Sequence, residues 1–547
     1  MPETQATPLL DIRDLRIDGH YQDAWQPLIK GLDLSLQRGE ILGLIGESGA
    51  GKSTLGLAAM GYVRDGCRFS GGSVRFDGID LLHATPQVLR RLRGLRIAYV
   101  AQSAAASFNP AHRLIDQHVE SAVINGGVSR AQAEAEAVQL YRVLRLPDPE
   151  QIGQRYPHQV SGGQLQRVMT AMAMACHPDL IIFDEPTTAL DVTTQIEVLA
   201  AIREAVKTYR SAALYISHDL AVVAQMADRI MVLRHGQLVE QAPTRRMLSD
   251  PQQDYTKSLW AVRSFRTAAK PEPARERPLL ELRKVCAAYG RQPVLEDVCL
   301  SLHAGQTLAV IGESGSGKST TARVISGLLP PTSGQLLYDG QPLPLDYRQR
   351  SKEQLRRVQM IYQIPDTALN PRQRIVDILG RPLSFYLGLK GAALRARVGE
   401  LLEMMELDPA IYMQRQPREL SGGQKQRICI ARALAAEPQL IICDEVTSAL
   451  DQLVAEGVLK LLDRIQRQLG VAYLFITHDV ATVRAIADQV LVMQRGRVVD
   501  QGSRSRIFTP PYQDYTGLLF SSEPEMDPDW LDQLLARRGA PSTLQTD

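Results

Sequence analysis

Short, unbroken apolar runs alternate along the chain with longer stretches in which apolar residues recur at helical spacing. An unbroken apolar run is typical of a strand that is covered on both faces. Strands that alternate with helical stretches favour an α/β domain with a largely parallel sheet. The runs are residues 41–45, 180–183 and 212–216, followed by residues 308–311, 440–443 and 472–476. The pattern therefore predicts the same kind of sheet in each half of the chain.

The polar segments around these runs also occur twice, in the same order. A Gly-rich segment that ends in Lys52 returns with Lys318, 266 residues later. Three further motifs return after 260 residues: Ser-Gly-Gly-Gln, an Asp-Glu pair, and a His-Asp pair preceded by Ser or Thr. This period is far longer than the repeat of a solenoid protein. It predicts two copies of one large domain.

Composition shifts place the predicted boundaries. We expect a first domain over residues 1–263, a linker over 264–278, a second domain over 279–520 and a tail over 521–547. Residues 268–278 are rich in Pro and charge, which is typical of a semi-extended linker. The tail has low hydrophobicity, so a mobile end and a short amphipathic helix around Trp530, Leu531, Leu534 and Leu535 both remain open.

The composition narrows the class of protein without identifying it. The chain has 547 residues, of which 44% are hydrophobic and 22% charged, as in ordinary globular proteins. Its net charge of +2 gives no reason to expect nucleic-acid binding. No run approaches the ~20 apolar residues of a membrane helix, residues 1–8 do not resemble a secretion signal, and the six cysteines form no C-x-x-C pair. We expect a cytosolic, multidomain protein.

The Gly-rich segments match the pattern G-x-x-x-x-G-K-[ST], which binds phosphates. Its glycines let backbone N–H groups curl around phosphate oxygens, and the following helix presents its positive end. The lysines are expected to reach the β- and γ-phosphates of a nucleotide, and the following serines to ligate Mg²⁺. The residues concerned are Gly46, Gly49, Gly51, Lys52, Ser53 and Thr54 in the first copy, and Gly312, Gly315, Gly317, Lys318, Ser319 and Thr320 in the second.

An acidic pair closes one apolar run in each half. Asp184 and Asp444 stand at the end of the run, where a carboxylate can hold Mg²⁺ beside the phosphate loop. Glu185 and Glu445 follow directly and are expected to polarise an attacking water as general bases. Taken alone, such a pair is more often a solvated strand end. Its place downstream of a phosphate loop, in both halves, favours the catalytic interpretation.

The Ser-Gly-Gly-Gln motif precedes a helical pattern in each half. One interpretation is a helix cap made by the serine, with flexible glycines behind it. The other is a second helix N-terminus that offers a hydroxyl and backbone N–H groups to a γ-phosphate. The duplication favours the second interpretation. The motifs are Ser161, Gly162, Gly163 and Gln164, and Ser421, Gly422, Gly423 and Gln424.

Three weaker signals complete the candidate sites. His218 and His478 follow apolar runs and are expected to hold the attacking water and a γ-phosphate oxygen. A glutamine at the end of another run is expected to sense Mg²⁺ or that water, and a tyrosine before each phosphate loop to stack on the base. The glutamines are Gln102 and Gln363, and the tyrosines are Tyr21, for which Trp25 is an alternative, and Tyr289.

The ordered set of motifs resembles the nucleotide-binding domain of ATP-binding cassette (ABC) proteins, over about residues 8–262 and 279–520. The resemblance implies two tandem P-loop NTPase domains of the α/β class. Each is expected to have a largely parallel sheet core, an antiparallel β subdomain and a helical subdomain that carries the Ser-Gly-Gly-Gln signature. It also implies that ATP and Mg²⁺ lie between the phosphate loop of one half and the signature of the other. Residues 189–191 and 449–451 look like the D-loops that link the two sites.

Further motifs resemble the peptide, dipeptide and nickel importer subfamily of ABC ATPases. They are residues 155–161, 108–110 and 369–371, together with Tyr255-Thr256 and Tyr515-Thr516 near the two domain ends. The resemblance implies an ATPase at the cytoplasmic face of the inner membrane that works with two integral-membrane permeases and an extracytoplasmic solute-binding protein. Val160 and Val446 depart from the family pattern but remove no catalytic group, so two hydrolytic sites are expected.

A tandem cassette that acts on ribosomes or nucleic acid is the alternative function. The arginines Arg90, Arg91, Arg93 and Arg96 are suited to phosphate backbones, although they also fit a solvated helix face. The linker is short and rich in Pro, unlike the long charged helical linker of such proteins. We therefore expect no nucleic-acid partner. The transported solute stays open among oligopeptides, dipeptides, glutathione, nickel and related small molecules.

Overall fold

The structure is a computed structural model that describes residues 7–21, 24–187, 190–261, 266–267, 277–448 and 450–539. The chain divides into two compact units. Unit 1 comprises Met1–Trp260 together with Pro524–Asp547, and unit 2 comprises Ala261–Glu523. Most of the predicted linker lies outside the described residues. No described helix combines the length and the apolar character that crossing a membrane requires.

A six-stranded sheet forms the centre of unit 1, in the order β10-β9-β3-β8-β7-β6. All neighbouring strands run parallel except β9 and β10, which pair antiparallel. The three strands predicted from unbroken apolar runs, β3, β7 and β8, are buried at every residue. The strands are β3 (Ile41–Ile45), β6 (Ile97–Val100), β7 (Leu180–Asp184), β8 (Ala212–Ile216), β9 (Arg229–Arg234) and β10 (Gln237–Pro243).

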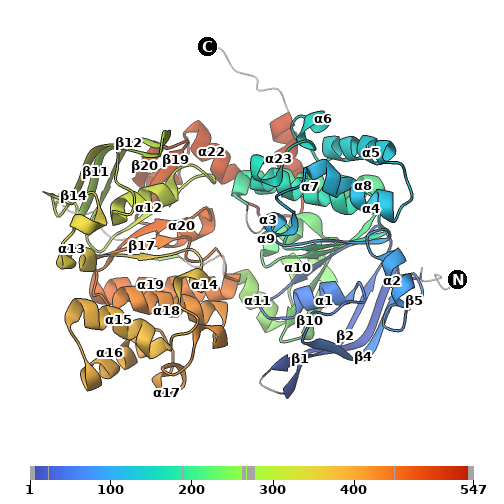
Figure 1. Cartoon of the computed structure of the whole chain (residues 1–547), viewed down its shortest axis with the longest axis horizontal. Coiled ribbons are helices and arrows are strands. Elements are labelled where there is room, and N and C mark those ends of the chain that lie inside the picture. The colour runs from blue at the N-terminus through green and yellow to red at the C-terminus, as the bar shows by residue number, and fades with distance from the viewer. Residues whose placement is uncertain are drawn as a thin grey trace, which may run out of the picture. The chain divides into compact units, whose positions relative to one another are not determined.

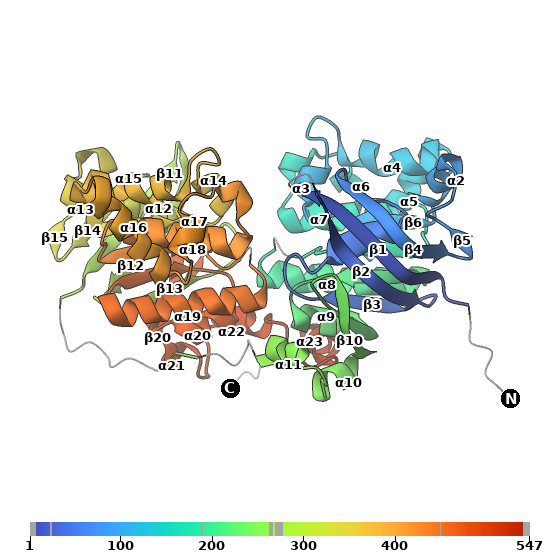
Figure 2. The same cartoon turned by 90° about the horizontal axis from the view of Figure 1, so that it is seen from below.

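A second, antiparallel sheet of unit 1 has the order β2-β1-β4-β5. Figure 2 shows β1, β2 and β4 side by side in this sheet. Its inward side chains share one apolar core with the parallel sheet, as Ile12 and Leu34 do with Leu42 and Leu214. The strands are β1 (Leu10–Tyr21), β2 (Ala24–Leu36), β4 (Cys67–Phe76) and β5 (Ile79–Asp80).

Helices α4 to α7 group on one side of unit 1, apart from β1, β2 and β4 (Figure 1). The order along the chain places this helical group between β6 and β7. The helices of the unit are α1 (Lys52–Ala58), α2 (Pro86–Leu92), α3 (Ala104–Ser107), α4 (Leu114–Ile124), α5 (Arg130–Val143), α6 (Pro149–Ile152), α7 (Gly162–Met174), α8 (Val192–Tyr209), α9 (Leu220–Met226), α10 (Thr244–Ser249) and α11 (Asp254–Ala261).

Unit 2 repeats this arrangement, with sheets β12-β11-β14-β15 and β16-β17-β18-β13-β19-β20. Its strands are β11 (Leu280–Tyr289), β12 (Gln292–Leu302), β13 (Thr307–Ile311), β14 (Ser333–Tyr338), β15 (Gln341–Pro342), β16 (Val358–Ile361), β17 (Leu440–Asp444), β18 (Ala472–Ile476), β19 (Gln489–Gln494) and β20 (Arg497–Ser503). Its helices are α12 (Lys318–Ser326), α13 (Lys352–Arg357), α14 (Pro365–Ala368), α15 (Ile375–Leu387), α16 (Gly391–Met404), α17 (Pro409–Tyr412), α18 (Gly422–Leu434), α19 (Gln452–Leu469), α20 (Val480–Ile486), α21 (Arg504–Ile507) and α22 (Asp514–Ser521). The predicted fold class is confirmed in both units.

The basic run that suggested nucleic acid is partly used inside unit 1. Arg93 donates to two backbone carbonyls after α1, and Arg96 forms ion pairs with two aspartates. Arg90 and Arg91 are exposed in the last turn of α2. Half of the run therefore stabilises the fold, and the remainder matches the solvated helix face.

The C-terminal segment forms a helix that packs on unit 1. Helix α23 spans Trp530–Gly539, and its residues Trp530, Leu531 and Leu534 are buried. Of the two interpretations of the tail, the amphipathic helix is the one that the structure shows. The chain thus leaves unit 1 after Trp260 and returns to it at Pro524.

A buried glutamine on α9 binds the backbone of this segment. Gln225 Nε2 donates to the carbonyl oxygens of Glu525 and Asp527, both at 2.8 Å, and Gln225 Oε1 accepts from the N–H of Leu531 at 3.0 Å. The side chain is 3% exposed, so all its amide groups are used within the unit. Gln225 therefore satisfies three backbone groups of the tail at once.

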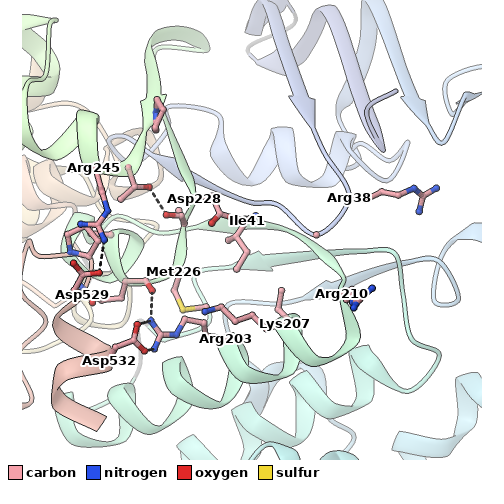
Figure 3. A pocket seen from close by; sticks show the side chains of 18 residues that line it. Arg38, Ile41, Arg203, Lys207, Arg210, Met226, Asp228, Arg245, Asp529 and Asp532 are labelled. Atoms are coloured by element: carbon pink, nitrogen blue, oxygen red, sulfur yellow. Dashed lines mark hydrogen bonds and ion pairs between the residues drawn. The ribbon is translucent and has the colours of Figure 1, made fainter. Parts of the chain in front are cut away.

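Two ion pairs border the same contact. Figure 3 shows Asp532 turned toward Arg203 and Asp529 turned toward Arg245. The Arg245–Asp529 pair spans 2.7 Å, and both side chains are largely exposed. These pairs lie at a cavity of about 870 Å³, which is lined by residues 528, 529 and 532 of the tail and by residues of β3, α8, α9 and α10 in the same unit. Because surface ion pairs contribute little to stability, the attachment rests mainly on the buried apolar side chains of α23 and on the Gln225 contacts.

We expect Gln225→Ala to lower the free energy of unfolding of the first unit by about 1–3 kcal/mol, since three backbone groups of the tail lose their partner. Chemical denaturation measures this change, and limited proteolysis measures release of the tail. Gln26→Ala, on an exposed position of β2, is the control. An unchanged midpoint with an unchanged cleavage rate would contradict the assignment.

Candidate active site

The loop between β3 and α1 has the backbone that the Gly-rich pattern predicts. Gly46 has φ 149°, and a Cβ there would lie 2.1 Å from the carbonyl oxygen of Leu233, so only glycine fits. Gly49 has φ 82°, and no atom would lie within 4 Å of its Cβ. The loop is thus packed against the fold at one glycine and open at the other. Gly312 and Gly315 repeat both features.

The loop lysines curl back over the loop. Lys52 Nζ donates to the carbonyls of Gly46 at 2.7 Å and Glu47 at 3.0 Å, and its side chain is buried. Lys318 makes the same two bonds at 2.7 Å each. An ammonium group held over a cradle of backbone N–H groups is suited to a phosphate.

A hydroxyl and a carboxylate meet beside each loop. Ser53 Oγ donates to Asp184 Oδ1 at 2.9 Å, and Ser319 Oγ to Asp444 Oδ1 at 3.1 Å. Burial raises the pKa of Asp444, although the bond from Ser319 acts in the opposite direction. A divalent cation would offset this cost, and hydroxyl and carboxylate oxygens are ligands that Mg²⁺ prefers. The residues present therefore fit Mg²⁺.

The glutamates that follow β7 and β17 each contact two other predicted residues. Gln102 Nε2 donates to Glu185 Oε2 at 2.9 Å, and His218 Nδ1 lies 3.3 Å from the same oxygen. In unit 2, Gln363 Nε2 lies 2.6 Å from Glu445 Oε2, and His478 Nδ1 lies 3.4 Å from Glu445 Oε1. In each unit, a glutamine and a histidine from distant parts of the sequence therefore contact one carboxylate.

Both glutamates have a backbone conformation that is unusual for their type. Glu185 and Glu445 each have φ 51°, in the left-handed region. Their N–H groups donate to the last residue of the neighbouring strand, Ile216 or Ile476, at 2.9 Å. Such a conformation costs about 1–3 kcal/mol and tends to occur at functional sites. The strain turns these side chains toward the glutamine and histidine.

Each Glu–His pair favours its charged form. Burial lowers the pKa of His218 and of His478, but the bond and charge of the neighbouring glutamate raise it more, so the pKa of each imidazole lies above its usual value. Burial raises the pKa of Glu445, and the bond and charge of His478 with the charge of Lys318 lower it more. An ionised carboxylate is the form that a general base requires.

The directions of these pKa shifts predict how the stability of the protein depends on pH. A histidine with a raised pKa stabilises the fold below its unfolded value of about 6.5, and the effect fades as the pH rises through the folded pKa. The lowered pKa of Glu445 stabilises above about 4.3 and fades as the pH falls through the folded value. The stability difference between the parent and His218→Gln/His478→Gln should therefore peak between about pH 4.5 and 6.5 and shrink above it. Denaturation series across pH test this, with exposed His83→Gln as control.

The signature serines cap helices and remain accessible. Ser161 Oγ accepts from the N–H of Gln164 at 3.3 Å, and Gln164 Oε1 accepts from the N–H of Ser161 at 3.1 Å, at the start of α7. Gly163 is required by packing, because its Cβ would lie 2.1 Å from Thr194 Cγ2, whereas Gly162 is exposed. Both interpretations of the motif are thus compatible with the geometry.

The second signature has the same construction. Ser421 and Gln424 exchange the same two hydrogen bonds at the start of α18, and Gln424 Nε2 also donates to Tyr412 OH at 2.9 Å. A Cβ on Gly423 would lie 2.5 Å from Val454 Cγ1, and Gly422 is exposed. In both signatures the bonds between serine and glutamine stay within the first turn of the helix that the motif starts. In each unit the structure brings together the loop lysine, the serine–aspartate pair and the Gln–Glu–His cluster, and the charge of the lysine acts on the histidine.

A family model described as ABC transporter matches residues 29–188 and 295–448, which is more than half of the chain. The chain belongs to the ABC transporter family. It is an ATP-hydrolysing subunit that binds ATP with Mg²⁺. A second model, described as the C-terminal region of oligopeptide/dipeptide transporters, matches residues 499–547.

The ABC ATPase has relatives over nearly its whole length. It is 36% identical to the glutathione import ATP-binding protein GsiA of Escherichia coli strain K12, with 96% of this chain and 91% of that protein covered. The GsiA protein of Salmonella typhimurium strain LT2 gives the same identity and coverage. The solved structure of cbiO1 from Clostridium perfringens, part of the ABC transporter complex cbiONQ, covers 43% of this chain and 91% of its own, with 29% identity and a TM-score of 0.39.

One residue of the ABC ATPase site was not predicted from the sequence. Tyr99 OH donates to Asp184 Oδ2 at 2.6 Å, opposite the bond from Ser53. Burial and this bond raise the pKa of Tyr99 above its ordinary value. Met360 occupies the same register in unit 2, because Tyr99 pairs with Ile182 and Met360 with Ile442. A polar aromatic residue three positions before Gln102 was the available signal, and it has no counterpart before Gln363.

The tyrosines predicted to stack on the base are the last residues of β1 and β11, which are inner strands of the two antiparallel sheets. Tyr289 is 43% exposed, and its OH accepts from Arg323 on α12 at 2.9 Å, so it lies near the helix that starts at the phosphate loop. Tyr21 is half exposed at the end of β1, and Arg68 covers one face of the competing Trp25 ring at 4.1 Å. Base stacking stays a prediction for both units.

Parts of the predicted D-loops lie outside the described residues, namely Ala189 and Ala449. The following aspartates are described. Asp191 accepts from the N–H of Thr194 and Asp451 from that of Val454, each at 3.0 Å, so both cap the helix that follows.

Proposed function

We propose that this ABC ATPase powers an importer for peptides or related small solutes, of the oligopeptide, dipeptide, glutathione or nickel type. Two observations support this class. The relatives with 36% identity are glutathione import ATP-binding proteins, and residues 499–547 match the C-terminal region of oligopeptide/dipeptide transporters. The solute itself contacts other subunits of such an importer, so the ATPase sequence does not select among these solutes.

The site geometry supports a role for each residue. Lys52 and Lys318 bind the phosphates together with the loop glycines and Thr54 or Thr320. Ser53 with Asp184, and Ser319 with Asp444, would hold Mg²⁺, which would neutralise charge on the phosphates, and Gln102 and Gln363 would sense the ion or the attacking water. Glu185 and Glu445 accept a proton from the attacking water, and His218 and His478 orient it.

We infer that each site is completed by the signature of the other half. Ser421 to Gln424 would serve the site of Lys52, and Ser161 to Gln164 that of Lys318. The support is chemical. Each signature offers an exposed serine and an exposed glycine at the N-terminus of a 13-residue helix. The positive end of the helix dipole and the unpaired backbone N–H groups there favour the binding of an anion. The two halves that form such a site would belong either to one chain or to two chains.

The partners follow from the importer class. The ATPase would dock on two integral-membrane permeases at the cytoplasmic face of the inner membrane, and an extracytoplasmic solute-binding protein would deliver the solute. Residues 103–123 and 364–387, which follow Gln102 and Gln363, would pass the motion to the permeases. In unit 2 this segment exposes Ile364 at 51% and Phe385 at 57%, apolar surface that a partner can cover.

The similarity to import ATP-binding proteins over nearly the whole chain carries the importer proposal, and the convergence of glutamine, glutamate and histidine in both units supports the hydrolytic roles. Its test is co-purification of the tagged full chain with integral-membrane permeases from the cells that make it, followed by ATPase measurement in proteoliposomes. We expect the rate to rise when the solute-binding protein is added with glutathione, a dipeptide or Ni²⁺. Capture of ribosomal subunits without permeases would contradict it.

A further inference from the structure

In each unit, a helix that follows the parallel sheet in the sequence, α11 or α22, contacts the phosphate loop of the same unit. Tyr255 OH, on α11, accepts from the N–H of Glu47 at 3.2 Å across 208 residues of sequence. Tyr515 OH, on α22, accepts from the N–H of Glu313 at 3.0 Å across 202 residues. Glu47 and Glu313 are the second residues of their loops. The same long-range contact therefore occurs twice.

The loop residue that contacts tyrosine also contacts the loop lysine. Glu47 O accepts from Lys52 Nζ at 3.0 Å, and Glu313 O accepts from Lys318 Nζ at 2.7 Å. One loop residue is thus fixed at both polar backbone groups: its N–H by a tyrosine and its C=O by the lysine. These bonds determine which way the loop backbone faces where the phosphates bind.

The two tyrosines are themselves held in place. In unit 1, the guanidinium of Arg234 lies 4.6 Å from the Tyr255 ring centre, and burial raises the pKa of Tyr255 to about 12. Glu240 accepts from the N–H groups of Gln252 and Gln253 at 2.8 and 3.0 Å, which fixes the turn into α11.

In unit 2, Tyr515 is 8% exposed. The next residue, Thr516, is fully buried and donates to Asp500 Oδ2 at 3.1 Å. A tyrosine held by its surroundings restricts the loop more than a freely moving one would.

We propose that Tyr255 and Tyr515 are positioning residues for ATP: each hydroxyl holds the second loop residue so that the rest of the loop is preorganised for the phosphates. Neither hydroxyl needs to touch the nucleotide. A loop that is already ordered loses less conformational freedom on binding, so the expected effect is on affinity. The proposal concerns the ATP site and is independent of which solute is imported.

Tyr255→Phe/Tyr515→Phe tests the proposal, because it removes the two hydroxyls and keeps the rings. We expect the KM for ATP to rise about two- to tenfold, the size of one lost hydrogen bond per site, and kcat at saturating ATP to stay within about twofold of the parent. The Kd for ATP in the presence of EDTA, measured by equilibrium binding, should rise by the same factor. Tyr62→Phe, which removes the hydroxyl of an exposed tyrosine, is the control.

An unchanged KM and Kd would overturn the proposal, whatever happens to the melting temperature. A fall in kcat with unchanged KM would also overturn it, since that result would place the hydroxyls in the hydrolytic step. If Tyr255→Phe alone raises the KM of one kinetic phase and Tyr515→Phe that of another, the assignment of one tyrosine to each loop is supported. Failure of the importer proposal would appear separately, as normal ATPase kinetics without permease binding.

Discussion

Replacing both Glu185 and Glu445 with glutamine is expected to leave ATP binding intact and to lower the steady-state ATPase rate by about 10²–10⁴-fold. The range is that of a positioned general base. Glutamine keeps the size of the side chain and an oxygen that can accept from Gln102 or Gln363, but it cannot accept the proton of water. Radiolabelled nucleotide that stays bound to the double variant should therefore be ATP and not ADP. The measurements are the ratio of ATP to ADP in the bound nucleotide and the rate of hydrolysis.

The single variants separate the two sites. Their active-site surroundings differ at Tyr99 and Met360, so Glu185→Gln and Glu445→Gln are expected to lower the rate by different factors. Glu204→Gln, on an exposed ion pair of α8, is the matched control and should match the parent. If the double variant hydrolysed ATP at the parent rate, the assignment of both glutamates as general bases would be wrong.

Replacing both Lys52 and Lys318 with alanine should abolish measurable ATP binding at the concentrations that saturate the parent. Each lysine is 6% exposed and its ammonium lies over the loop, so its loss removes charged hydrogen bonds to phosphate and also the bonds that order the loop. Hydrogen bonds to charged groups are worth about 1.5–3 kcal/mol each, so we expect affinity to fall by at least about 10²-fold per site.

Equilibrium dialysis with ATP and Mg²⁺ measures this loss. Lys257→Ala, which removes a largely exposed lysine of α11, should bind as the parent does. Arginine at position 52 or 318 is not expected to restore binding, because the planar guanidinium is larger than the buried ammonium it replaces. Nucleotide affinity within twofold of the parent in the alanine variant would contradict the assignment of the loops.

Prediction from the sequence was most successful where the residues of one short segment determine the local structure by themselves. The phosphate loop needs glycine, lysine and serine at fixed spacing, and each central strand needs a continuous apolar run. Both features are local, so the pattern around Lys52 and Lys318 located the loops and the strands before them. The period between the copies then gave two domains of one kind, which the units confirm.

The convergence of Gln102, Glu185 and His218 needed the strand order as well. These residues follow β6, β7 and β8, which are neighbours in one parallel sheet, so their carboxyl ends meet at one edge. The sequence predicted a role for each residue but not the 2.9 and 3.3 Å contacts that join them.

By itself, the sequence determined the fold class, the duplication and the residue types of both ATP sites, because strand burial and phosphate binding are encoded within short segments. Only the tertiary structure decided the contacts of Tyr99, Tyr255 and Tyr515, and the packing of α23 on unit 1 through Gln225. These contacts join residues 85 to 306 positions apart. A tyrosine or glutamine in a helix or strand has no local pattern that distinguishes a surface side chain from one bonded to a distant loop. Which partner such a side chain meets depends on how the sheets and helices pack.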